Sequence, residues 1–345
     1  LEEQLKKAGL DVIIDDTGNK IGGEAGNIIA RFTPKFIKNN QPIFLSAHMD
    51  TVMVEKEIIP SISDDMLIRN KNNKDILGAD DKAAIAAIIE AVKVINEYEL
   101  RTGIIYIIFT VGEETALLGS KNINMDNIES DIGFVFDADG KVGTIINKAP
   151  FHNRIDLKIT GKASHAGVSP EKGINSIKAA AFAISNTFSG RIDDETTCNI
   201  GKIEGGTETN VVPETTTVSI EARSMNENKL EKITNQIIEN FIKSAAEYSA
   251  KLEYKVLREY DGYEVDENNI AVRIAKKAIE KIGITPRLKP TGGGSDTNNF
   301  NSKNKIAVNL TTGFENCHSV DEYIPFDELK KLTKLIIEIC TFEEG

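Results

Sequence analysis

The chain has 345 residues, more than one hydrophobic core usually organises, so we expect two domains. Its 41 Lys and Arg against 53 Asp and Glu give a formal net charge of −12. An acidic chain has no positive field that attracts phosphate backbones or anionic lipid, so we expect neither nucleic acid nor a membrane as a partner.

The cellular compartment is indicated by apolar runs and by cysteines. The longest apolar run, residues 103–111, is well short of the roughly 18 residues that span a bilayer, and the first residues read as an acidic amphipathic stretch rather than a signal peptide. Cys198, Cys317 and Cys340 are odd in number and irregularly spaced, which favours free thiols in a reducing compartment. We therefore expect a cytoplasmic protein.

Up to residue 150 the chain alternates short apolar runs with helical stretches. The runs lie at residues 43–45, 103–109 and 132–136, and their continuous apolar character is typical of parallel strands covered on both faces. A helical pattern separates the first two runs, and either Asp80 or Asp81 can serve as its N-cap. This part of the chain predicts βαβ units.

From residue 151 the pattern changes to alternating polar and apolar residues. The predicted order over residues 151–261 is β-α-β-β-α-β, which is that of a ferredoxin-like domain. An α/β pattern then resumes over residues 262–345. We therefore predict an α/β fold in which residues 1–150 and 262–345 form one discontinuous domain and residues 151–261 are inserted into it.

Imidazole and carboxylate side chains gather where the predicted strands end, and ligands of open α/β sheets bind at the carboxyl ends of strands. Each has an ordinary structural explanation, such as a helix cap or a solvated loop. Together they suit zinc, manganese or cobalt, and a bridging carboxylate suits two metals about 3.5–4 Å apart. The residues are His48, Asp50, Asp80, Asp81, Glu113, Glu114, Asp137 and His318.

His48 and Asp50 are separated by one residue at the end of the first run. Side chains two residues apart on a strand point the same way, so we expect the Asp50 carboxylate to hydrogen-bond the His48 ring. Such a contact would fix the tautomer of a metal-binding imidazole.

Eight sequence motifs, in this order, carry a resemblance that covers nearly the whole chain. They are AHMDTV, LGADDKAA, TVGEETALLGS, FVFDAD, GKASHAGVSPEKG, GGTETNVVPE, GGGSD and ENCHSVDEYI. The series resembles the co-catalytic zinc aminopeptidase/carboxypeptidase/aminoacylase family, and most of all its peptidase T branch of tripeptide aminopeptidases. The resemblance implies a zinc-peptidase catalytic domain with an inserted ferredoxin-like (βαββαβ) lid domain, through which relatives form dimers.

The resemblance also implies roles for residues that match the motifs. Two zinc ions, replaceable by cobalt or manganese, would be bound by His48, Asp80, Glu114, Asp137 and His318, with Asp80 bridging. Glu113 would be the general acid/base, and Asp50 the partner of His48. Substrate would be bound by His165, Asn210, Arg223 and Gly293, with His165 donating to the oxyanion.

The implied activity is removal of the N-terminal residue from short peptides. A dipeptidase or an N-acyl-amino-acid deacylase uses the same metals and base, and a metal-free homologue without activity is a further alternative. Two residues match no family position: we expect His152 to face solvent and Cys317 to be a small buried side chain. Relatives have a helix ahead of Leu1, so we expect an incomplete N-terminus.

Overall fold

The structure is a computed structural model that describes residues 1–37 and 41–343. It divides into two compact units. The α/β unit comprises residues 1–148, 264–291 and 295–345, and the inserted unit comprises residues 149–263 and 292–294. The predicted α/β class with an inserted domain is confirmed.

The division differs from the predicted boundaries mainly at one internal segment. The two junctions also shift by two residues each, because residues 149–150 and 262–263 belong to the inserted unit. Residues 292–294 were expected in the discontinuous α/β domain, but they pack with the inserted unit. Gly294 lies directly against the Tyr260 ring, where an added Cβ would come within 2.2 Å of Cζ, and Arg223 donates to the Gly292 carbonyl at 3.3 Å. These contacts join residues that are distant in the sequence, so no local pattern indicated them.

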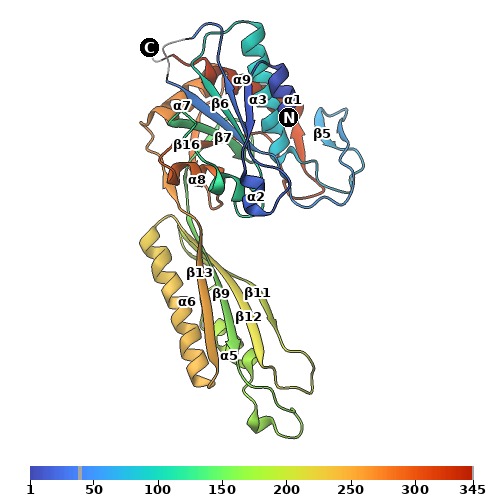
Figure 1. The fold of residues 1–345 in the computed structure, drawn as a ribbon, viewed down its shortest axis with the longest axis vertical. Coiled ribbons are helices and arrows are strands. Elements are labelled where there is room, and N and C mark those ends of the chain that lie inside the picture. Colours follow the sequence, from blue (N-terminus) through green and yellow to red (C-terminus); the bar gives the residue numbers. More distant parts are fainter. Residues whose placement is uncertain (38–40, 344–345) are drawn as a thin grey trace. The chain divides into compact units, whose positions relative to one another are not determined.

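Within the described residues, nine strands form the mixed sheet of Figure 1, in the order β1-β2-β6-β3-β7-β16-β8-β14, with β15 beside β8. The central strands β6, β3, β7 and β16 are parallel neighbours. The strands are β1 (Asp11–Ile14), β2 (Ile28–Phe32), β3 (Ile43–His48), β6 (Ile105–Thr110), β7 (Ile132–Ala138), β8 (Thr144–Ala149), β14 (Tyr263–Glu264), β15 (Arg287–Pro290) and β16 (Ile306–Thr311).

Helices pack on this sheet because each has an apolar face. Helix α9 packs on both α3 and α7, which themselves pack on the central strands, while α4 packs on α8 and α8 on β16. The helices are α1 (Glu2–Lys7), α2 (Thr17–Ile21), α3 (Ala79–Glu97), α4 (Leu118–Asn122), α7 (Ile270–Lys281), α8 (Asp296–Ser302) and α9 (Phe326–Cys340). A small separate sheet contains β4 (Pro60–Ile62), β5 (Leu67–Asn70) and β17 (Tyr323–Pro325).

One close approach in the core joins the two strands that end in site residues. Gly133 in β7 lies over the ring of Phe44 in β3, and an added Cβ would lie 2.0 Å from Cζ of that ring. The rings of Phe44 and of Phe300 in α8 also pack in a T-shaped arrangement, with a centroid distance of 5.1 Å. Glycine is therefore required at this position of β7 for steric reasons.

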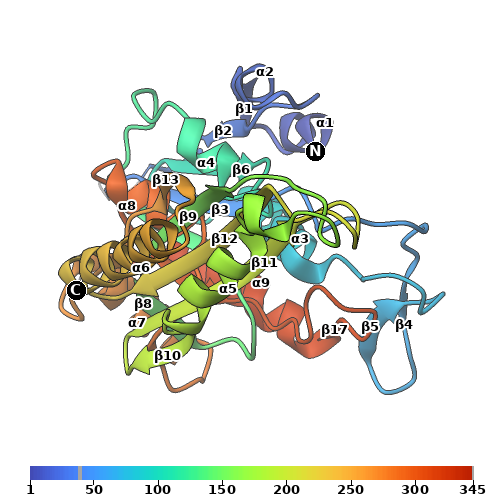
Figure 2. The ribbon, with the colours of Figure 1, turned by 90° about the horizontal axis from the view of Figure 1, so that it is seen from below.

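In the inserted unit an antiparallel sheet has the order β10-β11-β12-β9-β13. Helices α5 and α6 pack against each other on one of its faces (Figure 2), which is covered by Ile155, Leu157 and other apolar side chains. The short strand β10 is additional to the predicted βαββαβ order. The elements are β9 (Phe151–Thr160), η1 (Pro170–Lys172), α5 (Ser176–Ser185), β10 (Gly190–Asp193), β11 (Thr196–Gly205), β12 (Thr215–Ser224), α6 (Glu227–Glu247) and β13 (Lys251–Tyr260).

Two single-residue expectations have different outcomes. His152 was expected to face solvent, which is wrong: its side chain is 12% exposed, lies 3.4 Å from a Glu221 carboxylate oxygen and packs edge-on to Tyr260. Cys317 was expected to be a small buried side chain; it is half-buried and packs beside the apolar cluster that contains Leu77 and Phe314. All three cysteines are free thiols. Among the described residues, no helix combines the length and apolar character needed to cross a membrane.

Candidate metal centre

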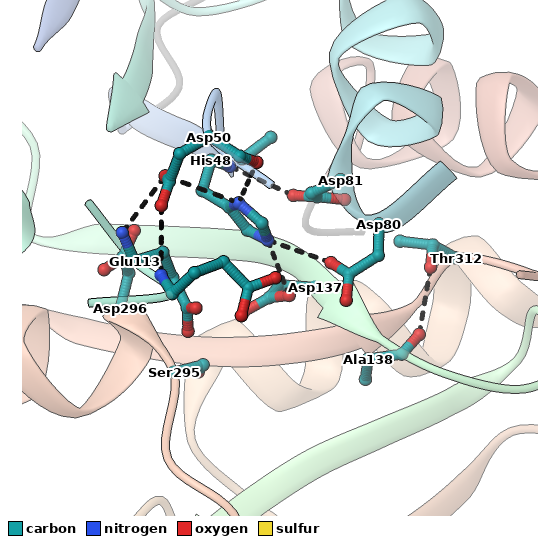
Figure 3. A network of polar contacts seen from close by, with 12 residues as sticks. His48, Asp50, Asp80, Asp81, Glu113, Asp137, Ala138, Ser295, Asp296 and Thr312 are labelled. Atoms are coloured by element: carbon teal, nitrogen blue, oxygen red, sulfur yellow. Dashed lines mark hydrogen bonds and ion pairs between the residues drawn. The ribbon is translucent and has the colours of Figure 1, made fainter. Parts of the chain in front are cut away.

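His48 is the last residue of β3, a strand that lies between β6 and β7, and its side chain is only 2% exposed. Its Nε2 atom is 2.9 Å from Asp80 Oδ1 and 3.5 Å from Asp137 Oδ1 (Figure 3). Its Nδ1 atom is 3.0 Å from the backbone carbonyl of Asp50. When Nδ1 donates to this carbonyl, the Nε2 lone pair is directed at the two carboxylates, as in metal-binding imidazoles.

Asp80 connects this group to a second imidazole. Its other oxygen, Oδ2, is 3.1 Å from His318 Nε2, which in turn is 2.8 Å from Glu114 Oε1. One carboxylate therefore faces His48 with one oxygen and His318 with the other. The Cys317 thiol belongs to the same neighbourhood, since its Sγ lies within 4.8 Å of the ligand atoms of Asp80 and His318.

The start of α3 differs from the prediction. Asp80 or Asp81 was expected to cap the helix, but α3 has Gly78 as its N-cap and no side-chain cap, and both aspartates have non-helical backbone angles. The Asp81 carboxylate is fully buried and accepts a hydrogen bond from the His48 backbone N–H at 3.1 Å. Because the two aspartates precede the regular turns of the helix, their side chains face β3 rather than the helix end.

Asp50 also has other partners than predicted. Its Oδ1 is 3.7 Å from His48 Nδ1, beyond hydrogen-bond distance, although the two groups form an ion pair when the ring is protonated. Its two oxygens instead accept the backbone N–H groups of Glu113 and Glu114, each at 3.1 Å. The strand ends at His48, so the alternation on which the prediction rested does not extend to Asp50. The Asp50 carboxylate therefore anchors the segment that carries the two glutamates.

The pKa values reflect a crowded group of buried acids. Burial raises the pKa of Glu113 well above 4.5, and the charges of Asp137 and Asp296 add to this shift. Burial likewise raises the pKa of Asp137 to about 7, although the His48 ring opposes the shift. Burial lowers the pKa of His48, but its contacts with Asp137, Asp50 and Asp80 outweigh this and raise it well above 6.5.

This donor set fits a pair of divalent cations. Two imidazoles and three carboxylates converge from five separate segments, and like charges this close are unfavourable without a compensating positive charge. The neighbouring Lys82 directs its ammonium group to the Met49 carbonyl, at 2.6 Å. The residues that would hold the cations are His48, Asp80, Glu114, Asp137 and His318.

Sequence reasoning missed two buried acids beside these residues. Asp296 opens α8, is 2% exposed and accepts hydrogen bonds from Thr110 Oγ1 and Ser120 Oγ. It lies in the GGGSD motif, of which only the glycines were considered. Glu322 is also 2% exposed and accepts the backbone N–H groups of the segment that leads to Asp80. The feature of the sequence that could have indicated Glu322 is its position four residues after His318, within the motif ENCHSVDEYI.

The predicted substrate-binding residues all lie in the inserted unit, in two pairs. His165 forms a β-bridge with Val211, and the carbonyl of Asn210 accepts the N–H of the residue after His165 at 2.9 Å. Arg223 donates to Glu221 Oε2 at 3.0 Å and to the Gly292 carbonyl, which places it beside the segment that contains Gly293.

An open α/β sheet that gathers two imidazoles around a shared carboxylate at its carboxyl edge is typical of metal-dependent hydrolases. Residues 44–341 match the sequence model of Peptidase family M20/M25/M40. The chain belongs to this family, and the predicted resemblance to its peptidase T branch is confirmed.

Three relatives illustrate the similarity. The "Uncharacterized protein YqjE" of Bacillus subtilis is 40% identical over 98% of this chain and 90% of its own length. The crystal structure of aminopeptidase PepT from Bacillus cereus superposes with a TM-score of 0.89 at 40% identity, covering 98% of this chain and 90% of that one. The crystal structure of a tripeptidase from Staphylococcus aureus superposes with a TM-score of 0.93 at 34% identity, also covering 98% of this chain and 90% of that one.

Proposed function

We propose that this chain is a dinuclear zinc aminopeptidase that removes the N-terminal residue from unblocked tripeptides. The observation that carries the proposal is the contact of the two Asp80 carboxylate oxygens with two different imidazoles, those of His48 and His318. The names of the aminopeptidase and tripeptidase structures at 40% and 34% identity support the substrate class.

In this proposal the ligands divide into two sets that share Asp80. His48 and Asp137 complete one set, while Glu114 and His318 complete the other. The bound ions would lower the pKa of a water molecule towards 7 and polarise the scissile carbonyl. The chain itself supplies His48, Glu114 and Asp137 at or next to the ends of β3, β6 and β7, and Asp80 and His318 from two loops.

Glu113 is the proposed general acid/base. Its carboxyl is largely buried, and the pKa is raised by burial and by neighbouring acids, which suits a group that takes and returns a proton near neutral pH. Asp50 holds the Glu113 backbone by the N–H at 3.1 Å, so the side chain starts from a fixed position. Glu113 would accept the proton of the attacking water and pass it to the departing amine.

We further propose that His165, Asn210, Arg223 and Gly293 bind the substrate. The Arg223 guanidinium is suited to a peptide carboxylate because it can form paired hydrogen bonds to two oxygens. His165 would donate to the oxyanion that forms at the scissile carbonyl. A cytoplasmic location and a homodimer formed through the inserted unit complete the proposal; the free thiols support the former.

A substrate panel tests the proposal. One zinc-loaded sample is assayed against unblocked tripeptides, dipeptides, N-acetylated amino acids and longer peptides, with a chelator-treated sample as the control. We expect the highest kcat/KM for tripeptides, with the N-terminal residue as the first product. Faster turnover of N-acetylated amino acids would establish a deacylase instead, and faster turnover of dipeptides a dipeptidase. The proposal would be overturned if none of these substrates were hydrolysed in a metal-dependent reaction.

A further inference from the structure

Glu322 lies four residues after His318, immediately before β17, and has no role in the proposed reaction. Its side chain points into the α/β unit and accepts three backbone hydrogen bonds. Oε2 accepts the N–H groups of Leu77 and Gly78, both at 2.7 Å, and Oε1 accepts the N–H of Asp80 at 3.0 Å. A single carboxylate thus binds most of the N–H groups of a four-residue segment.

These contacts are stronger than ordinary backbone hydrogen bonds. A carboxylate that is 2% exposed loses most of its hydration, and donors that replace this hydration form short, charge-assisted bonds. The segment it binds includes Gly78, whose φ of +72° turns the chain into α3. Without an acceptor, the three buried N–H groups would each lose a partner, so the turn depends on this carboxylate.

The same residue connects two loops that carry metal-site residues. Through its side chain Glu322 holds the backbone of Asp80, and through four residues of chain it is tied to His318, whose Nε2 is 3.1 Å from Asp80 Oδ2. Glu322 is therefore placed where it can fix the distance between Asp80 and His318. By contrast, His48 and Asp137 are held by the neighbouring parallel strands β3 and β7.

We infer that Glu322 is a positioning residue that sets Asp80 against His318 and so controls the affinity of the metal position formed by Asp80, Glu114 and His318. This rests on the proposed metal centre. The other position, formed by His48, Asp80 and Asp137, depends less on Glu322 because two of its three ligands belong to the sheet. The inference predicts an unequal effect on two ions bound by one chain.

Glu322→Gln tests this because an amide has one acceptor oxygen, whereas its NH2 group would face a backbone N–H. The matched control is Glu328→Gln in α9. Glu328 is also buried, at 6% exposure, and accepts the Val142 N–H at 2.8 Å and the Lys331 ammonium at 2.6 Å. It therefore reports the general effect of neutralising a buried, hydrogen-bonded glutamate in the same unit.

The measurement is a titration of the metal-free chain with Zn²⁺ in competition with a chromophoric chelator, which resolves two dissociation constants. We expect two ions per wild-type chain. In Glu322→Gln one of the two constants should rise by about 10–100-fold, the usual effect of losing a group that orients a ligand, while the other stays within about threefold. The kcat should recover at saturating Zn²⁺. Glu328→Gln should match the wild type in both constants.

Unchanged constants in Glu322→Gln, or equal weakening of both sites, would overturn the inference. Circular dichroism and thermal unfolding of each metal-free variant establish that it is folded. If Glu322→Gln does not fold, Glu322→Asp is titrated instead, because it keeps the carboxylate charge but has a shorter side chain. Weaker Zn²⁺ binding at one site only would support the inference, and wild-type dissociation constants at both sites would overturn it. A wild-type chain that binds fewer than two ions would instead refute the proposed metal centre, whichever substrate it hydrolyses.

Discussion

Replacing each of the adjacent glutamates by glutamine should separate proton transfer from metal binding. In both variants the backbone N–H remains bound to Asp50, at 3.1 Å in either case, so the segment keeps its place. Glu113→Gln removes only the ability to exchange a proton. Glu114→Gln removes the charge of an oxygen that is 2.8 Å from His318 Nε2 and thus weakens a ligand.

The expected magnitudes differ accordingly. Loss of a general base lowers kcat by about 10²–10⁴-fold, which corresponds to about 2.7–5.4 kcal/mol of activation free energy. Glu113→Gln should therefore lose kcat by this factor with two metal ions still bound. Glu114→Gln should bind the second ion at least about 10-fold more weakly, because even groups that only orient a ligand contribute that much.

The assay combines tripeptide turnover with elemental analysis of the same dialysed samples, with Glu90→Gln on the exposed face of α3 as the control. Elevated zinc during the assay should restore part of the activity of Glu114→Gln and none of that of Glu113→Gln. The reasoning would be refuted if Glu113→Gln lost metal while Glu114→Gln kept both ions and stayed inactive. Wild-type kcat in a fully loaded Glu113→Gln enzyme would also refute it.

Three further outcomes are expected. Chelation should abolish hydrolysis and Zn²⁺, Co²⁺ or Mn²⁺ should restore it; peptide hydrolysis by a sample shown by elemental analysis to hold no metal would contradict the proposed chemistry. Gly133→Ala should lower the free energy of unfolding by about 1–3 kcal/mol or more, because the added Cβ would lie 2.0 Å from the Phe44 ring. Denaturant titrations should show a smaller loss when the same change is made in a Phe44→Leu background. An equal loss in that background would show that the clash is not with the ring. His165→Ala should keep both metals and lose far more in kcat than in KM, and in a dimer its mixture with Glu113→Gln chains should regain activity; unaltered turnover would remove His165 from the mechanism.

The pattern of elements and most residues of the candidate metal centre could be predicted from the sequence because they depend on local features. Continuous apolar runs predicted the buried parallel strands β3, β6 and β7, and the polar residue that ends such a run lies at the carboxyl edge of the sheet. His48, Glu114 and Asp137 follow this rule. Asp80 and His318 were assigned as ligands by the family motifs, and the structure places them in contact with each other, with Asp80 also beside His48 and His318 also beside Glu114.

Only the tertiary structure decided which partner each polar side chain takes. Asp50 binds the amides of Glu113 and Glu114, and Glu322 binds the amide of Asp80 from 242 residues away. Backbone N–H groups are the same in every residue, so nothing in a sequence marks the ones that a distant carboxylate will reach. The fold brings these groups together by strand order and loop path, and that long-range arrangement determines which acids face a metal position and which hold the chain beside it.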